Sequence, residues 1–140
     1  MATLRLEILT PEAVAYSEDV EMVLLPAELG ELGVYPMHVP LMTRLLPGEL
    51  VVTKGGEKLH LAIGEGFADV TQTGVRVLVD MALEERHIDE TAAEAAVAKA
   101  QAAMKEAAAG GLAGTAELAA VQASLARSLA QLKVKRRRHS

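Results

Sequence analysis

Apolar residues fall at every second position through much of the first 88 residues, which is typical of half-buried β-strands. The first two segments of this kind carry their apolar residues at Leu4, Leu6, Ile8 and at Val20, Met22, Leu24. Further strands are expected at Glu49–Thr53, Lys58–Ile63, Phe67–Thr71 and Val75–Val79. Turn signals separate them at Pro47-Gly48, Gly55-Gly56, Gly64-Glu65-Gly66 and Thr73-Gly74. Short strands at this spacing predict an antiparallel β-sandwich or flattened barrel over residues 1–86.

The pattern changes at residue 89, where two alanine-rich segments begin that contain no proline and no internal glycine. They span residues 89–109 and 115–133, and Gly110, Gly111 and Gly114 lie between them. Alanine is the strongest intrinsic helix former, so each segment predicts an α-helix. With a short glycine-rich connection, residues 87–140 predict an antiparallel helical hairpin. The expected fold is therefore a two-part α+β chain.

The second predicted helix has one apolar stripe, with a shallower alanine face beside it. The stripe consists of Leu118, Val121, Leu125, Leu129 and Leu132. An alanine methyl group has little surface to bury, and its burial contributes only about 0.8 kcal/mol. Packing between two helices of this composition is therefore weak. We interpret it as a movable arm with the three glycines as its hinge. A permanently packed helical pair is the alternative.

Composition removes several classes of protein. The chain has no cysteine and therefore no disulfide or thiolate metal site, and its only aromatic residues are Tyr16, Tyr35 and Phe67. The N-terminus lacks the features of a secretory signal, and no segment approaches the ~20 uncharged apolar residues of a membrane span. We expect a soluble, cytosolic protein with an aliphatic core.

Charge is distributed unevenly along the chain. Residues up to Glu117 hold all nineteen acidic residues and eight of the fourteen basic ones. The six remaining basic residues all follow, at Arg127, Lys133, Lys135, Arg136, Arg137 and Arg138. A basic end on an acidic body suggests that the end seeks an anionic surface. The alternative is a solvated terminus without a partner.

The stretch from Leu24 to Leu50 combines prolines and glycines with apolar side chains, so we expect an ordered loop with short extended pieces. Its apolar members include Leu32, Val34, Tyr35, Met37, Val39, Leu41 and Met42. A solvated loop would not need them. They either cover the end of the sandwich or face another protein.

Catalytic signatures are absent from the sequence. No lysine and hydroxyl residue follow the glycines near residue 30 as a phosphate-binding loop would require. No nucleophile elbow occurs, and the four histidines, at positions 38, 60, 87 and 139, lack metal-ligand spacing. We therefore expect a non-catalytic protein without a metal or a cofactor.

Two segments resemble a known family. Gly30-Glu31-Leu32-Gly33-Val34-Tyr35-Pro36, continued by His38, Pro40-Leu41 and Pro47-Gly48, resembles the signature of the ε subunit of F-type ATP synthase. The segment 64–70, GEGFADV, resembles the family's later G-G-F-x-E-V segment, with Glu65 and Asp69 as departures. The resemblance covers the full length, and its architecture agrees with the elements predicted above.

The resemblance implies a rotor subunit that couples the γ shaft to the c-ring and inhibits ATP hydrolysis through its helical arm. The γ-contact residues implied are His38, Pro40, Leu41, Met42 and Thr43. When extended, the arm would meet the α3β3 hexamer at its β subunits, and its candidate contacts are Arg127, Lys133, Lys135 and Arg136. Helices of this length would reach roughly 60 Å when straightened.

Many bacterial members of the family carry I-D-x-x-R-A at the start of the first helix, which is associated with ATP binding. Here the residues are Ile88-Asp89-Glu90-Thr91-Ala92-Ala93, so Asp89 and Ala93 match and Ala92 replaces the arginine. Arginine binds phosphate through paired hydrogen bonds. We therefore expect ATP, the one regulatory ligand implied, to bind weakly or not at all. Asp89 has an alternative role as a helix N-cap, and Thr91 with Glu94 makes a capping box conceivable.

The resemblance also implies a location and leaves one rival function. A peripheral position on the cytoplasmic face of a bacterial plasma membrane is expected, held there only by the complex, with the thylakoid stromal face as second choice. The rival is a binding module whose basic tail contacts nucleic acid. The acidic body and the scarcity of stacking aromatics argue against it.

Overall fold

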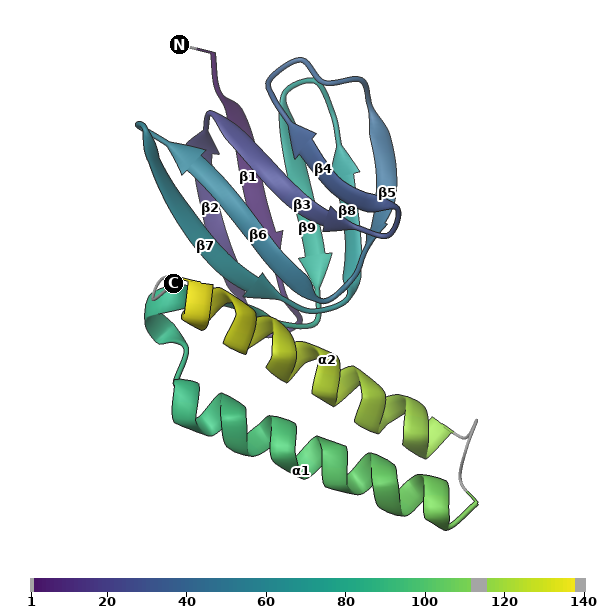
Figure 1. Ribbon diagram of the computed structural model, residues 1–140. Coiled ribbons are helices and arrows are strands. Elements are labelled where there is room, and N and C mark those ends of the chain that lie inside the picture. The colour runs from purple at the N-terminus through teal and green to yellow at the C-terminus, as the bar shows by residue number, and fades with distance from the viewer. Residues whose placement is uncertain (1, 112–115, 138–140) are drawn as a thin grey trace.

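A computed structural model describes residues 2–111 and 116–137, and it places a β-structure above a pair of helices (Figure 1). The strands are β1 (Leu4–Leu9), β2 (Val14–Val20), β3 (Met22–Ala27), β4 (Gly30–Val34), β5 (Leu41–Leu45), β6 (Gly48–Lys54), β7 (Glu57–Ile63), β8 (Gly66–Val70), β9 (Gly74–Val79) and β10 (Ala82–Glu84). A 3-10 helix, Glu85–His87, leads into α1 (Glu90–Ala109) and α2 (Ala116–Arg137).

The strands form one hydrogen-bonded path that folds over on itself. Its order is β10-β7-β6-β3-β5-β8-β9-β1-β2, with β4 paired to β3. β3 meets β5 only at Ala27 and Leu45, and there the path turns from one layer of the sandwich to the other. β1 and β9 run parallel, while the other pairs of the described strands are antiparallel. The ion pair between Lys54 and Glu18 (2.6 Å) links β6 and β2 across the open side.

The core between the layers is aliphatic, as the composition predicts. Leu6, Ile8, Val52 and Ile63 have no exposed surface, and they come from strands of both layers. Tyr16 is the aromatic residue of this core, and burial, followed by its hydrogen bond to Glu18, raises its pKa to about 12. The sandwich predicted from the alternation is confirmed.

The prediction that Val20, Met22 and Leu24 share the buried face of one strand is wrong. The strand does not run through Glu21, because β2 ends at Val20 and β3 begins at Met22. Val23 and Leu25 are therefore the fully buried residues of β3, while Met22 and Leu24 lie toward the outside. A shift of one residue moves every side chain of a strand to the other face.

The proline-rich stretch is more regular than a loop. It contains β4 and β5, which pair with β3 and β8 respectively. Its apolar residues divide between the two predicted roles: Val34 is buried in the core, and Leu32 and Leu41 pack against it, but Tyr35 and Met37 are exposed. The segment both covers the sandwich and presents an apolar surface.

Turn geometry explains the paired glycines of the β6–β7 hairpin. Lys54 pairs with Glu57, which leaves a two-residue turn. Gly55 and Gly56 have φ angles of 60° and 78°, a left-handed conformation that glycine adopts without steric cost. The predicted hairpin at this position is confirmed.

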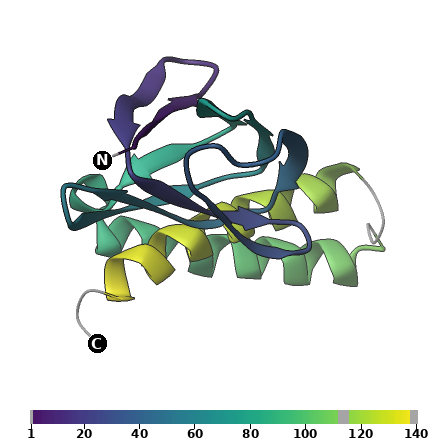
Figure 2. The same ribbon diagram turned by 90° about the horizontal axis from the view of Figure 1, so that it is seen from above.

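The two helices form the predicted hairpin, with α2 lying between α1 and the sandwich (Figures 1 and 2). Because α2 touches partners on two sides, one stripe does not describe its buried surface. Leu125 and Leu132 face α1, whereas Ala130 and Val134 face the sandwich. Leu129, a member of the predicted stripe, is 46% exposed because it lies on neither side. Neither helix is long and apolar enough, within the described residues, to cross a bilayer.

Candidate interaction surfaces of the sandwich and the arm

The outer face of the sandwich is the solvent side of β2, β1, β9, β8 and β5. Four apolar side chains form a row across it, because the strand register aligns Val14 with Leu9, Leu9 with Leu78, and Leu78 with Phe67. Val14 and Phe67 are each more than half exposed. A row of exposed apolar residues on one sheet face is typical of a protein-binding surface.

The candidate γ contacts lie beside this row, but they do not share one face. Met42 is 70% exposed and points outward from β5. Leu41 and Thr43, its neighbours on the same strand, are half-buried, since successive strand residues point to opposite sides. Pro40 is exposed, and His38 is half-buried with its Nδ1 atom 2.7 Å from the carbonyl oxygen of Val39. Of residues 41–43, only Met42 therefore presents its side chain to a partner on the outer face.

Sequence reasoning missed the row itself, whereas it did single out three further apolar residues of the proline-rich stretch. Tyr35, Met37 and Val39 are 63%, 67% and 72% exposed, on the connection between β4 and β5. Met37 has a φ of 70°, a left-handed conformation uncommon for a non-glycine residue, and its N–H donates to the carbonyl of Gln72 (2.8 Å). That hydrogen bond holds the connection against the β8–β9 turn.

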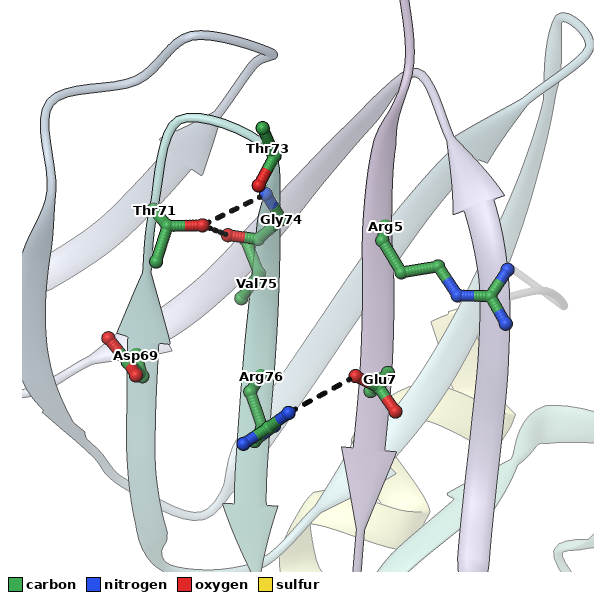
Figure 3. Close-up of a pocket in the computed structure, with 8 residues that line it drawn as sticks. All are labelled: Arg5, Glu7, Asp69, Thr71, Thr73, Gly74, Val75 and Arg76. Carbon is green, nitrogen blue, oxygen red and sulfur yellow. Dashed lines mark hydrogen bonds and ion pairs between the residues drawn. The ribbon is translucent and has the colours of Figure 1, made fainter.

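A shallow polar hollow occupies the other end of the outer face, between β8, β9 and β1 (Figure 3). Three of its charged residues bond within the chain: Arg76 pairs with Glu7 (3.6 Å), and Arg5 turns toward β2 to reach Ser17 and Asp19. Over residues 2–111 and 116–137, no group of acidic and histidine side chains is arranged to hold a metal ion. The hollow extends the outer face as a polar margin.

The arm docks on the opposite side of the sandwich, against β6, β7 and the segment that follows β9. The apolar contact is small: Ala62 of the sandwich and Ile88 of the connection meet Ala130 and Val134 of α2. Met81 and Leu83 pack at its margin, and the side-chain amide of Gln131 lies 3.1 Å from the sulfur of Met81. Small side chains in this contact allow helix and sheet to approach closely.

Three of the four candidate hexamer contacts bond within the chain in this structure. Arg127 pairs with Asp80 (3.2 Å), the residue after β9. Arg136 pairs with Glu90 (3.1 Å) and Glu94 (2.6 Å) of α1, and these carboxylates, Glu94 first, raise the pKa of its guanidinium. The ammonium group of Lys135 donates to the carbonyl of Glu85 (3.4 Å).

Lys133, the fourth candidate, is exposed on α2. It lines a groove between the arm and the sandwich, together with Leu24, Leu46 and Glu49. Glu49 is buried there and lies 3.3 Å from the imidazole of His60. The basic side of α2 thus sits next to acidic groups of the body along much of its length.

The start of α1 has the N-cap that the sequence allows. Asp89 Oδ1 accepts a hydrogen bond from the backbone N–H of Ala92 (3.1 Å). The capping box suggested by Thr91 and Glu94 does not form, since the cap lies two residues earlier and Glu94 pairs with Arg136. Ala93 is buried against α2, so its methyl group serves helix packing.

Helix α1 ends at the predicted hinge glycines. The N–H of Gly110 donates to the carbonyl of Glu106, and Gly111 follows with a φ of 77°. A left-handed glycine after the last turn is a common way to end a helix. Gly114 lies outside the described residues.

Comparison with known proteins decides the family. The beta-sandwich domain of the ATP synthase Delta/Epsilon chain matches residues 3–85. The ATP synthase epsilon chain of Laribacter hongkongensis is 39% identical over 95% of this chain and 93% of its own length. That of Herpetosiphon aurantiacus is 39% identical over 98% of this chain and 97% of its own. The chain belongs to the ATP synthase epsilon chains.

The fold has solved counterparts as well. A chain in the Euglena gracilis mitochondrial ATP synthase, solved with OSCP, F1 and c-ring, superimposes with a TM-score of 0.77 at 24% identity, over 95% of this chain and 81% of that one. A central stalk/c-ring structure from Tetrahymena thermophila gives 0.53 at 12% identity, over 62% and 70%. As an epsilon chain, the protein is a non-catalytic stalk subunit of the membrane-associated ATP synthase complex.

Two departures from the family pattern, Glu65 and Ala92, have visible consequences in the structure. Glu65, which replaces a glycine, pairs with Arg44 on the neighbouring strand (2.5 Å). Gly66 must remain glycine, because a Cβ there would overlap the backbone of Leu78. Ala92, in place of the arginine, is exposed on the first turn of α1 and leaves this position without a phosphate ligand.

Proposed function

We propose that this epsilon chain couples the γ shaft to the c-ring and restrains ATP hydrolysis when its arm leaves the sandwich and extends toward the α3β3 hexamer. The observation that carries the proposal is the contrast in packing. The sandwich holds a continuous aliphatic core, while the arm is held to it by Ala62, Ile88, Ala130, Val134 and a few partly exposed polar contacts. Such an interface is small enough to open while both helices remain intact.

The γ shaft is proposed to bind the outer face. Met42, Phe67 and Leu78 offer exposed apolar area on strands of a rigid sheet. Tyr35 and Met37 add a separate apolar area, on the connection that packs against the β8–β9 turn. A lone domain gains nothing by exposing these side chains, whereas a partner would bury them. The apolar contact of the arm, around Ala62, lies on a different side of the sandwich, and the arm borders the proposed γ surface only at Asp80, which binds Arg127 and lies beside Leu78.

Truncation separates the two roles. A chain ending at Ile88 should assemble with γ as the full chain does, and complexes that contain it should hydrolyse ATP faster. Failure of the truncated chain to bind γ would contradict the assignment of the outer face. Unchanged hydrolysis would contradict the regulatory role of the arm.

A reversible lock tests arm movement directly, because the chain has no native cysteine. Ala62→Cys with Ala130→Cys places two thiols in the buried contact between sheet and helix. We expect oxidation of this variant within the complex to relieve inhibition and reduction to restore it. Ala62→Cys alone is the control, and it should not respond to oxidant.

ATP is proposed to have little effect on the arm in this protein. Ala92 supplies no guanidinium, and Asp89 is occupied by its capping hydrogen bond. Ala92→Arg should tighten ATP binding if the missing guanidinium is the defect, as measured by isothermal titration. An unchanged titration would reject that explanation.

We also propose a peripheral position on the cytoplasmic face of a bacterial plasma membrane, where the ATP synthase complex would hold the chain.

A further inference from the structure

We propose that Asp80, Glu90 and Glu94 are internal substitutes for the acidic surface that the extended arm would bind. They hold the guanidinium groups of Arg127 and Arg136 in the folded arm, so extension requires an exchange of carboxylate partners. The inference rests on the proposed function for the identity of the outside partner, a carboxylate-rich protein surface. The internal contacts themselves are properties of the isolated chain.

Geometry gives the two arginines different tasks. Arg127 reaches Asp80, which belongs to the sandwich, so this pair ties α2 to the body (3.2 Å). Arg136 reaches Glu90 and Glu94, one turn apart on α1, so this pair ties α2 to the other helix. A partner that takes both guanidinium groups must separate α2 from the sandwich and from α1. Straightening of the hairpin is thereby linked to the exchange.

The strength of the pairs suits an exchange. The side chains of these five residues are between 35% and 54% exposed. Ion pairs in such positions contribute weakly, since water and salt screen them, and each changes a closed-to-open ratio by about two- to fivefold. A buried pair would resist release, while a pair of this strength can be replaced by carboxylates of a partner.

One glycine offers a way to disturb the sandwich pair without changing any charge. A Cβ atom at Gly64 would overlap the carboxylate of Asp80, which is the movable end of a side chain. Gly64→Ala should therefore displace that carboxylate from Arg127 while the backbone N–H of residue 64 still donates to the carbonyl of Met81 (2.9 Å). The variant therefore disturbs the position of the carboxylate and leaves the net charge of the chain unchanged.

The test measures the arm in the isolated full chain. Spin labels on Lys58→Cys, at the β6–β7 hairpin, and Gln122→Cys, on α2, report the distance between sandwich and arm; both native side chains are exposed. Asp80→Asn and Gly64→Ala should each lower the docked-to-released ratio about two- to fivefold. Glu106→Gln, which removes a charge from an exposed position on α1, should leave it unchanged. Equal ratios in all four chains would overturn the proposal.

Competition with an acidic probe tests the exchange itself. Poly-L-glutamate should release the arm of the unmodified chain at low salt. Asp80→Asn combined with Glu90→Gln and Glu94→Gln should lower the concentration needed by about tenfold, since the weak effects of the separate ion pairs multiply. Release that is insensitive to these substitutions would overturn the exchange. ATP hydrolysis by the assembled complex is a separate readout. If the substitutions change the label distances but not the inhibition of hydrolysis, the role of the internal ion pairs is supported and the proposed regulatory function is rejected.

Discussion

The sandwich and the arm differ in what holds them together. The sandwich core consists mainly of leucine, isoleucine and valine side chains with almost no exposed surface. In α1 the buried residues are Ala93, Val97, Ala100 and Ala107, so that three of the four contribute only a methyl group. A fully buried leucine contributes roughly 1.5–3 kcal/mol and a methyl group about 0.8. The first region therefore gains much more free energy from burial per side chain than the second, as the proposed release of the arm requires.

A matched pair of leucine substitutions gives the largest expected effect. Leu6 has no exposed surface in the sandwich core, and Leu132 is nearly buried between the helices. Leu6→Ala should cost about 2–5 kcal/mol of sandwich stability, through lost contacts and a cavity. Leu132→Ala should reduce protection of the arm and leave the sandwich unchanged. Amide hydrogen exchange read by region measures both, and equal loss of protection in both regions after either substitution would break the comparison.

Overpacking the docking contact should release the arm without unfolding it. Ala62 has no exposed surface beneath Ala130 and Val134, so a side chain as large as leucine would overpack the contact. Ala62→Leu should weaken docking by about 1–3 kcal/mol. We expect faster exchange in the last turns of α2, with the β6 and β7 amides still protected. Ala119→Leu, at an exposed position of α2, is the control and should change neither region.

Parts of the fold could be predicted because local pattern and tertiary role agree. Leu4, Leu6 and Ile8 alternate and are buried, and the Gly55-Gly56 turn allows little other than a tight hairpin. β2 was not predicted because Ser17, Glu18 and Asp19 make much of its sequence polar, and because a single residue, Glu21, separates it from β3. A one-residue gap between two strands cannot be recognised from the alternation of apolar and polar residues.

The surfaces were harder to predict than the elements. Leu41, Met42 and Thr43 are all implied γ contacts, yet the strand sends only Met42 to the outer face. The basic residues of α2 suggest an outside partner, and nothing in their spacing shows that Asp80 and Glu90 already bind two of them. Pairings over 46 and 47 residues depend on where the folded hairpin lies, which local sequence does not encode.

Alkaline pH should weaken the sandwich through one residue. The pKa of Tyr16 is about 12 in the fold, against 10.0 for the unperturbed group, so the neutral hydroxyl is favoured by folding. Its contribution is fully present below pH 10 and is lost as pH rises toward 12, on the order of 1–2 kcal/mol for a partly solvated hydroxyl. Tyr16→Phe should show a smaller decline in denaturation midpoint over this range, and Tyr35→Phe should follow the unmodified chain. Parallel declines in all three would remove Tyr16 as the cause.

The smallest effect is expected at the start of the arm. Asp89 caps α1 through the N–H of Ala92, and replacing an aspartate cap with alanine costs about 1 kcal/mol. Asp89→Ala should speed amide exchange in the first turn of α1, because that N–H loses its acceptor. Thr91→Ala, one residue into the exposed first turn, should instead slow exchange slightly, since alanine has the higher helix propensity. The sandwich amides should respond to neither substitution, because the cap stabilises only the helix that it begins. Slower exchange in β7 or β10 after Thr91→Ala would show that the arm and the sandwich unfold together, and the contrast between the two regions would then be lost.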